Sequence, residues 1–218
     1  MSINGLIRHF IEPLQMHDGL FGMRDLKFGR TMLCVALTLV LNSCDTERQW
    51  QLHDISGHLP DLRFSLMSDA GQPVTDQTYR GYLVMLFFGF TSCQAECPST
   101  LFRLAKIAQG LGDNAKLARI LFVTLDSGRD TPQVLHRYVA AFAAGHAIGL
   151  TGSESEIADL AKRYRTAYRP RKSASDDITH SAAVYVFDPQ GQARLLLTPE
   201  DAIETAANDL RHLLETAR

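Results

Sequence analysis

Two continuous apolar runs, separated by a segment with helical periodicity, constrain the fold of this chain most strongly. Tyr82–Phe88 and Arg119–Leu125 have the length and composition of strands that are buried on both faces. Between them, Pro98–Gly110 repeats apolar residues at the spacing of one helix face. A strand, a helix and a strand within about 45 residues form a βαβ unit, in which the two strands pair in parallel. The chain is therefore predicted to have an α/β fold.

The flanking segments extend this unit into a larger sheet. Ser153 and Glu156 have the spacing of a capping box, and Thr131–Pro132 has the composition of a helix start. Further elements are expected as a strand at 62–66, helices at 131–142, 153–165 and 199–216, and a hairpin of strands 182–187 and 194–197. A βαβ unit followed by helix, hairpin and helix is the thioredoxin-like order. We expect a thioredoxin-like fold, with a central mixed sheet flanked by helices.

The charge balance excludes one large class of function. The chain carries 22 basic and 24 acidic residues, and its formal net charge is -2. Proteins that bind phosphate backbones need a basic surface, which this composition does not supply. No nucleic-acid partner is expected.

The first 43 residues have the pattern of a secretory signal. Arg24, Lys27 and Arg30 precede the apolar run Met32–Leu41, and ten residues are too few to span a hydrocarbon core. The following Leu-Asn-Ser-Cys sequence, which ends at Cys44, resembles the lipobox of bacterial lipoproteins. Cys44 is therefore a candidate lipidation site, although an uncleaved anchor or a buried core helix would also explain the apolar run.

This signal divides the chain into three parts. Residues 1–43 are expected to direct export, with a possible true start at Met23; residues 44–61 are polar and suit a tether; residues 62–218 form the thioredoxin-like domain. The expected location is the periplasmic side of a bacterial membrane, where an N-terminal lipid or anchor holds the protein.

The chemistry concentrates in one close pair of cysteines. If residues 1–43 are removed and Cys44 is lipidated, Cys93 and Cys97 are the only thiols left. The pair follows a predicted strand and precedes Pro98, at which we expect the helix to begin, with both sulfurs in the preceding loop. The helix dipole favours a thiolate there by only about 0.3–1 kcal/mol, so the thiols should stay protonated unless something stronger, such as a soft metal ion, is bound.

The spacing of the pair leaves three readings open. Three residues separate Cys93 from Cys97, whereas thioredoxin-type oxidoreductases have two between their cysteines. Two thiolates on one metal ion suit this spacing, and a redox disulfide or an inert disulfide is also compatible with a loop. Metal binding is favoured.

A metal ion held by two thiolates needs a further ligand, and histidine is the first candidate. His180 directly precedes the strand 182–187, which a thioredoxin-like sheet places beside the cysteine loop, although an isolated loop histidine is more often no ligand. The other histidines lie in the signal, in the tether, inside helices or in a loop, and are less suitable: His9, His17, His53, His58, His136, His146 and His212.

In these residues the chain resembles the Sco/SenC family of copper-handling proteins. The similarity extends from about Leu62 to the end of the chain, and the pairing of Cys-x3-Cys-Pro with a distant His-Ser is specific to that family. The matching stretches are FFGFTSCQAECPSTL (87–101), LFVTLDSGRDTPQVLHRYVAAF (121–142), GLTGSESEIADLAKRY (149–164) and THSAAVYVFDPQG (179–191).

The resemblance implies a copper site and a partner. By family pattern, Cys93, Cys97 and His180 would bind copper as Cu(I), Cu(II) or both, and Asp126 and Asp130 would support the ligands or the fold. The implied role is delivery of copper to, or reduction of thiols at, the binuclear copper centre of cytochrome c oxidase, or service to another exported copper protein. The chain departs from the usual family pattern at Ser92, where histidine is common, and at 94–96, where Pro-Asp-Val is common.

A second class of function uses the same cysteines. A membrane-tethered thiol-disulfide reductase acting on exported proteins would need the pair but not His180. A metallochaperone without enzymatic turnover is the first expectation, and thiol-disulfide exchange is the alternative.

Overall fold

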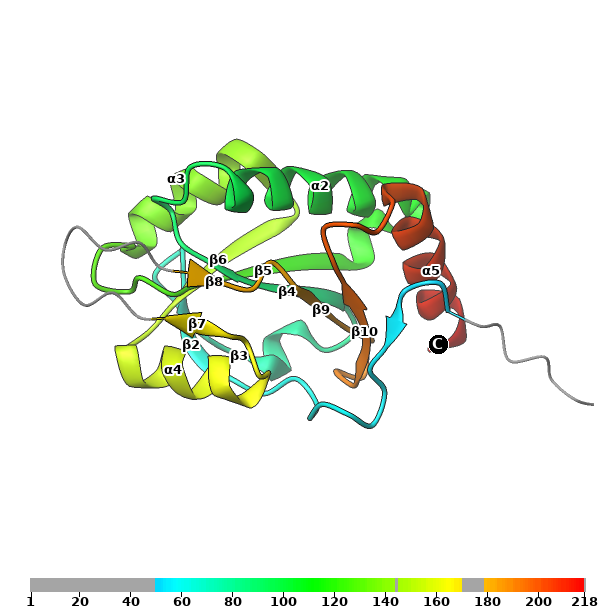
Figure 1. The fold of residues 1–218 in the computed structure, drawn as a ribbon, viewed down its shortest axis with the longest axis horizontal. Coiled ribbons are helices and arrows are strands. Elements are labelled where there is room, and N and C mark those ends of the chain that lie inside the picture. The colour runs from blue at the N-terminus through cyan, green and yellow to red at the C-terminus, as the bar shows by residue number, and fades with distance from the viewer. Residues whose placement is uncertain (1–49, 144, 170–178, 218) are drawn as a thin grey trace, which may run out of the picture. The chain divides into compact units, whose positions relative to one another are not determined.

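In the computed structural model, which describes residues 50–143, 145–169 and 179–217, a mixed sheet lies between layers of helices (Figure 1). The eight strands of this sheet, in spatial order, are β1 (His53–Asp54), β10 (Ala193–Leu197), β9 (Val184–Phe187), β4 (Leu83–Gly89), β5 (Ala118–Thr124), β6 (Ala147–Thr151), β2 (Ser65–Ser68) and β3 (Pro73–Thr75). A separate two-stranded ladder pairs β7 (Tyr168–Arg169) with β8 (Thr179–His180). The predicted thioredoxin-like fold is confirmed.

Strand β4 is the centre of the sheet. All seven of its residues are buried, and it pairs in parallel with β5 on one side and antiparallel with β9 on the other. Such a strand has no solvent face, which explains why its sequence is a continuous apolar run rather than an alternating one. The predicted βαβ unit is therefore present, with β6 extending it as a third parallel strand.

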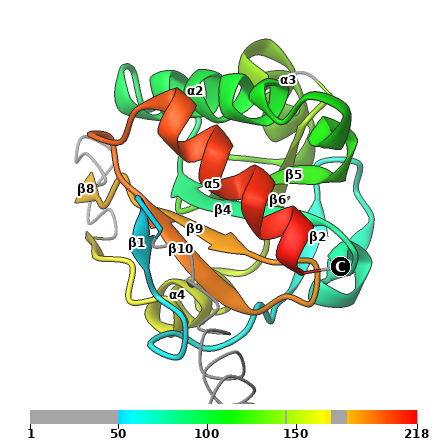
Figure 2. The ribbon, with the colours of Figure 1, turned by 90° about the vertical axis from the view of Figure 1, so that its right-hand side faces the viewer.

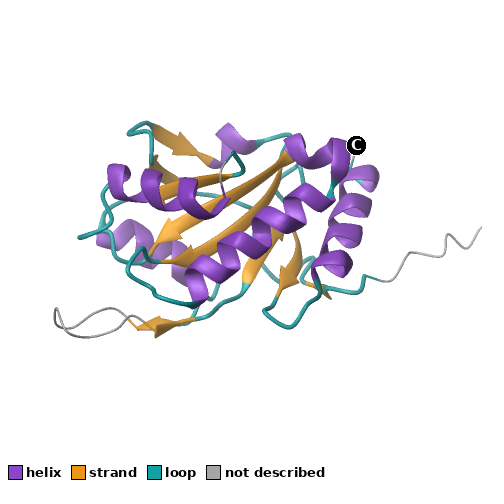
Figure 3. Ribbon diagram, turned by 90° about the horizontal axis from the view of Figure 1, so that it is seen from above, coloured by secondary structure: helices purple, strands orange, loops and turns teal. Residues whose placement is uncertain are grey.

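Four α-helices and two short 3-10 helices are present among the described residues. They are η1 (Asp76–Tyr79), α2 (Glu96–Gly110), η2 (Gly112–Leu117), α3 (Pro132–Ala143), α4 (Glu154–Arg163) and α5 (Ile203–Thr216). The predicted capping box forms at the start of α4, where the Ser153 hydroxyl accepts the N–H of Glu156 and the Glu156 carboxylate accepts the N–H of Ser153. Figure 3 shows the helices from above, with the strands of the sheet behind them.

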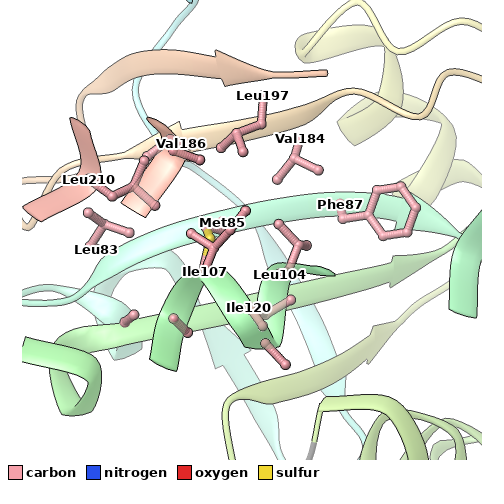
Figure 4. Close-up of a cluster of buried hydrophobic side chains, with 14 of the residues drawn as sticks. Leu83, Met85, Phe87, Leu104, Ile107, Ile120, Val184, Val186, Leu197 and Leu210 are labelled. Carbon is pink, nitrogen blue, oxygen red and sulfur yellow. The ribbon is translucent and has the colours of Figure 1, made fainter. Parts of the chain in front are cut away.

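The sheet separates the apolar core into two clusters, each covered by helices. Helices α2, α3 and α5 share one face of the sheet, where Leu104 and Ile107 pack with Met85 (Figures 2 and 4). Helix α4 covers the other face with Ile157 and Leu160. Because β4 contributes side chains to both clusters, the residues that follow it are held in position from both sides.

Two parts of the sheet differ from the sequence-based expectation. The predicted strand at 62–66 does show alternating burial, but its ladder begins only at Ser65. Strand β6 was not predicted, because Gly149 interrupts a short apolar run. That glycine lets α3 approach the strand, since a Cβ there would lie 2.8 Å from the Cβ of Leu135.

The domain extends further toward the N-terminus than the expected boundary at residue 62. Leu52 is 3% exposed, and β1 pairs with β10 at the edge of the sheet. The buried carboxylate of Asp209 on α5 accepts the backbone N–H groups of Gln51 and Leu52 at 2.8 and 2.9 Å. Residues 50–61, which their polar composition assigned to a tether, are therefore fixed to the domain by backbone pairing.

The proposed signal, Met23 and Cys44 lie outside the described residues. Within residues 50–143, 145–169 and 179–217, no helix combines the length and apolar character that crossing a bilayer requires.

Replacing Asp209 with Ala should release this N-terminal segment. The buried N–H of Leu52 would lose its acceptor, at a cost of about 1–3 kcal/mol, and the part-buried N–H of Gln51 would lose the same acceptor at a smaller cost. We expect a lower free energy of unfolding in urea and faster hydrogen exchange at residues 51–54. Asn208→Ala, which changes the exposed neighbour on the same helix, is the control; equal exchange rates in both variants would contradict the assigned role of Asp209.

Candidate metal centre

The two cysteines lie where β4 ends and α2 begins. Cys93 is in the intervening loop, and Cys97 is in the first turn of α2, which begins at Glu96. The prediction that the helix begins at Pro98, with both sulfurs in the loop, was therefore wrong for Cys97. Proline is tolerated in a first helical turn because its missing N–H would have had no intrahelical partner there.

Cys97 is fully buried, whereas Cys93 is partly exposed. The Cys97 sulfur packs against the end of β4 at Gly89, where a Cβ would lie 2.9 Å from Sγ and 2.6 Å from Cε2 of Phe122. The N–H of Cys97 donates to the Cys93 sulfur at 3.3 Å. Both cysteines are free thiols, and the absence of a side chain at Gly89 makes room for the inner one.

Strand pairing brings His180 to this loop. His180 ends β8, and the following strand β9 pairs with β4 so that Val184 lies opposite Phe87. The Nε2 atom of His180 lies 3.4 Å from the Cys97 sulfur. The imidazole is flanked by two rings, with centroids 6.0 Å away for Phe87 and 5.7 Å away for Phe90. The histidine thus reaches the cysteines from 83 residues away in sequence.

A backbone contact fixes which nitrogen of His180 faces the sulfur. Nδ1 lies 2.9 Å from the carbonyl oxygen of Ser181, which can only accept a hydrogen bond. Nδ1 therefore carries the proton in the neutral ring, and Nε2 presents its lone pair to Cys97. Metal-ligating histidines are commonly oriented in this way, by a carbonyl or carboxylate on the other nitrogen.

Together these three side chains form a compact donor set. The two sulfurs and one imidazole nitrogen all lie within 4.8 Å of one another, and no other group of three or more metal-ligating side chains was found among the described residues. Donors that share one metal ion in trigonal or tetrahedral geometry, with bonds of about 2.0 Å to nitrogen and 2.3 Å to sulfur, lie at most about 4 Å apart. A small contraction would allow all three atoms to share one soft ion.

The environment keeps the inner thiol protonated. Burial raises the pKa of Cys97, and the neighbouring Cys93 and Glu96 raise it further, against an opposing hydrogen bond from the Phe90 backbone. This agrees with the expectation that the helix dipole alone does not produce a thiolate. A bound metal ion would supply the missing positive charge.

Asp130 holds the start of the cysteine loop. Its carboxylate is 2% exposed and accepts three hydrogen bonds: from the Thr91 N–H at 2.9 Å, the Thr91 hydroxyl at 2.5 Å and the Thr124 hydroxyl at 2.5 Å. Thr124 ends β5, so this one carboxylate joins the ends of two neighbouring strands. Asp130 supports the loop and does not belong to the donor set.

Asp126 lies in the same region and holds an exposed arginine. It pairs with Arg129 at 2.5 Å, and the Arg129 guanidinium also donates to the Ser92 hydroxyl at 2.6 Å. Arg129 was not singled out in the sequence, although it lies inside the Asp-x3-Asp element. Ser92 directly precedes Cys93, so Arg129 connects the α3 side of the site to the cysteine loop.

The other histidines that the structure describes do not join the cysteines. His136 pairs with Asp69 at 3.2 Å, and His212 packs against Trp50 with ring centroids 5.2 Å apart. His53 and His58 are exposed, and His146 precedes β6. His9 and His17 lie outside the described residues.

Comparisons with known proteins match the same region. The family model described as SCO1/SenC matches residues 56–215. The mitochondrial SCO1 homolog 1 of Arabidopsis thaliana is 36% identical over 130 residues, which cover 58% of this chain and 39% of the relative. A SCO2-like protein of Rickettsia prowazekii is 35% identical over 133 residues, which cover 59% of this chain and 64% of the relative. The matched region is less than two thirds of the length of either relative.

The fold matches solved structures as well. The structure of Bradyrhizobium japonicum ScoI, determined with copper bound, superposes with a TM-score of 0.63 at 31% identity. That match covers 71% of this chain and 99% of the other.

The two aspartates should respond differently to substitution. Asp130→Asn replaces one acceptor oxygen with an amide NH2 that would face existing donors, and we expect it to reduce the free energy of unfolding by about 1–3 kcal/mol. Asp126→Asn weakens a pair whose arginine is 47% exposed and whose carboxylate is 10% exposed, and we expect it to cost less than Asp130→Asn because solvent reaches the arginine side of the pair. Urea unfolding of both variants measures the difference, and equal losses would contradict the anchoring role of Asp130.

Proposed function

Because the chain belongs to the SCO1/SenC family, we propose that it is a copper-binding assembly factor that delivers copper to an exported copper protein. The binuclear copper centre of cytochrome c oxidase is the proposed recipient, where the protein would hand over copper or reduce the receiving thiols. The observation that carries the proposal is the convergence of Cys93, Cys97 and His180 on one point.

The donor chemistry supports copper as the cargo. Two thiolates and one imidazole suit Cu(I), which prefers soft ligands, and the same set also accommodates Cu(II). The buried Cys97 and the rings of Phe87 and Phe90 would limit access of water to the ion. The relative from Bradyrhizobium japonicum, whose chain is matched almost completely, was solved with copper bound.

Proton release accompanies copper binding in this proposal. Each thiol must lose its proton to become a ligand, so copper affinity should increase with pH. The raised pKa of Cys97 makes the empty site resist ionisation, which disfavours reaction with adventitious electrophiles between deliveries.

Thiol-disulfide exchange is the second candidate. It is favoured by the free thiol state of both cysteines and by the partial exposure of Cys93, from which an exchange reaction could start. The oriented imidazole of His180, whose Nε2 lies 3.4 Å from the Cys97 sulfur, favours metal binding over exchange as the main activity, because exchange does not need it.

We propose that the protein faces the periplasm and is tethered through a lipid on Cys44. The support is the basic cluster at 24–30, the apolar run Met32–Leu41 and the lipobox-like ending. Five residues separate Cys44 from Trp50, where the described domain begins, and such a segment reaches at most about 20 Å. A short tether would keep the domain close to membrane-bound recipients.

His180→Ala separates the two candidate functions. Removing a metal ligand should weaken Cu(I) binding at least about 10- to 100-fold, because loss of a group that merely supports a ligand already costs that much. Cys93→Ser should cost more, since a hydroxyl is a poor ligand for Cu(I). The measurement is competition for Cu(I) against a chromophoric chelator, run beside a disulfide-reduction assay on the same proteins.

The control for this experiment is His58→Ala, which changes an exposed histidine outside the donor set. Wild-type protein oxidised to the Cys93–Cys97 disulfide should also bind copper weakly, because a disulfide offers no thiolate. If His180→Ala binds Cu(I) as tightly as the wild type and still reduces disulfides, the copper-delivery function is wrong and thiol-disulfide reduction becomes the proposed function.

The lipid anchor is tested by mass spectrometry of the membrane-extracted protein. The mature chain should begin at Cys44 and carry a diacyl or triacyl group, and Cys44→Ser should lose the acyl group and leave the membrane fraction. Recovery of an intact chain that starts at Met1 or Met23 would rule out this form of anchoring.

A further inference from the structure

A buried tyrosine hydroxyl near the two cysteines and His180 has no hydrogen-bond partner among the described residues. Tyr138 lies on α3, and its side-chain oxygen is buried without a hydrogen-bond partner among the described residues. Buried hydroxyls are nearly always paired, because an unpaired one loses its hydrogen bonds to water and gains nothing in return. An unpaired hydroxyl at this position is unfavourable unless it gains a partner in another state of the protein.

Ring packing places Tyr138 next to the cysteines. Its ring lies 5.4 Å, between centroids, from that of Phe122, and Phe122 shares the space above Gly89 with the Cys97 sulfur. Cys97 belongs to the apolar cluster on this face of the sheet, and Cys93 and Tyr138 both pack against that cluster. Burial raises the pKa of Tyr138, and the charges of Cys97, Cys93 and Asp130 add to the increase, which agrees with their proximity.

The acceptors near Tyr138 are occupied or weak when no metal is bound. The Asp130 carboxylate already accepts three hydrogen bonds from Thr91 and Thr124. The protonated Cys97 sulfur lies against Nε2 of His180, and a neutral thiol is a poor acceptor. A thiolate is a much stronger one, because hydrogen bonds to charged acceptors are shorter and about twice as strong.

We propose that Tyr138 is a positioning residue of the metal centre, and that its hydroxyl donates a hydrogen bond to the Cys97 thiolate when the cysteine pair holds a soft metal ion. The proposal rests on the proposed function, because it concerns the same site. Loading would give the hydroxyl the acceptor it lacks in the empty protein. Tyr138 thus favours the loaded state over the empty one without touching the ion.

A hydrogen bond to a ligating sulfur also changes the electronic properties of the metal. It withdraws electron density from the sulfur, which increases the energy of the sulfur-to-Cu(II) charge-transfer absorption and favours Cu(I) over Cu(II). These spectroscopic and redox effects distinguish the proposed role from simple packing, which would alter stability alone.

Tyr138→Phe tests the proposal, because it removes the hydroxyl and keeps the ring. Metal-free, reduced Tyr138→Phe should unfold at the wild-type temperature or above, since the lost hydroxyl had no partner. Its affinity for Cu(I), and for Cd(II) as a second soft probe, should fall by about 10-fold or more. The charge-transfer band of its Cu(II) form should move to longer wavelength.

Tyr164→Phe is the matched control. The Tyr164 hydroxyl donates to the carbonyl of Asp61 at 3.0 Å and accepts the N–H of Arg63 at 2.9 Å, and its ring packs in the cluster on the α4 side of the sheet. This variant should unfold at a lower temperature while keeping wild-type metal affinities and the wild-type absorption band.

The outcomes separate this inference from the proposed function. Unchanged affinities and an unchanged band in Tyr138→Phe would overturn the inference, as would a lower unfolding temperature of the metal-free variant with no spectral shift. Wild-type protein that binds Cd(II) but not Cu(I) would overturn the copper function, and the Cd(II) affinities of wild type and Tyr138→Phe would still decide the role of Tyr138. Wild-type protein that binds neither ion would overturn both.

Discussion

The candidate metal centre depends on the antiparallel pairing of β9 with β4. The cysteines follow β4 and the histidine precedes β9, so the two segments are distant in sequence and meet only because these strands are neighbours. An antiparallel pair brings the end of one strand to the start of the other. A shift of one residue in this register would move the side chains of β9 to the opposite face of the sheet, and both faces of β4 are closely packed. The register that fills the core therefore also sets the distance between sulfur and imidazole.

Much of this architecture could be predicted from hydrophobic periodicity, because the central strands are long and buried. Tyr82–Phe88 and Arg119–Leu125 agree with β4 and β5 to within one residue at each end. Short strands are harder to predict from the sequence, because tertiary contacts rather than composition decide whether they pair. β1 has only two residues; it pairs with β10, and the buried Asp209 from the far end of the chain binds Leu52 just before it.

The three candidate metal ligands could be predicted from the sequence, but the residues that position them could not. The cysteine spacing and the resemblance to a family indicated Cys93, Cys97 and His180, which the structure brings together. The start of α2 could not be predicted, because proline is compatible both with a loop and with a first helical turn. The roles of Gly89, Arg129 and Tyr138 depend on packing between separate elements, and no local sequence pattern reports such contacts.

The support around the donor set also shows how this chain accommodates its departure from the usual family pattern. Ser92 occupies a position where family members commonly have histidine, and here its hydroxyl accepts a hydrogen bond from Arg129. Arg129 is in turn paired with Asp126. The outer edge of the cysteine loop is thus fixed by a short chain of polar contacts at the surface, while Asp130 fixes its inner edge.

The separation of 83 residues between Cys97 and His180 has a consequence for the stability of the chain with and without a bound metal ion. A copper ion bound by Cys97 and His180 would act as a removable cross-link between the start of α2 and the end of β8. Anything that binds only the folded state adds to its stability, by about 2.7 kcal/mol when the free ligand is at 100 times its dissociation constant. The protein would become easier to unfold each time it gives up its cargo. Proteases that act on transiently opened chains would then remove empty molecules faster than loaded ones, so the supply of copper would itself regulate how much of the carrier persists.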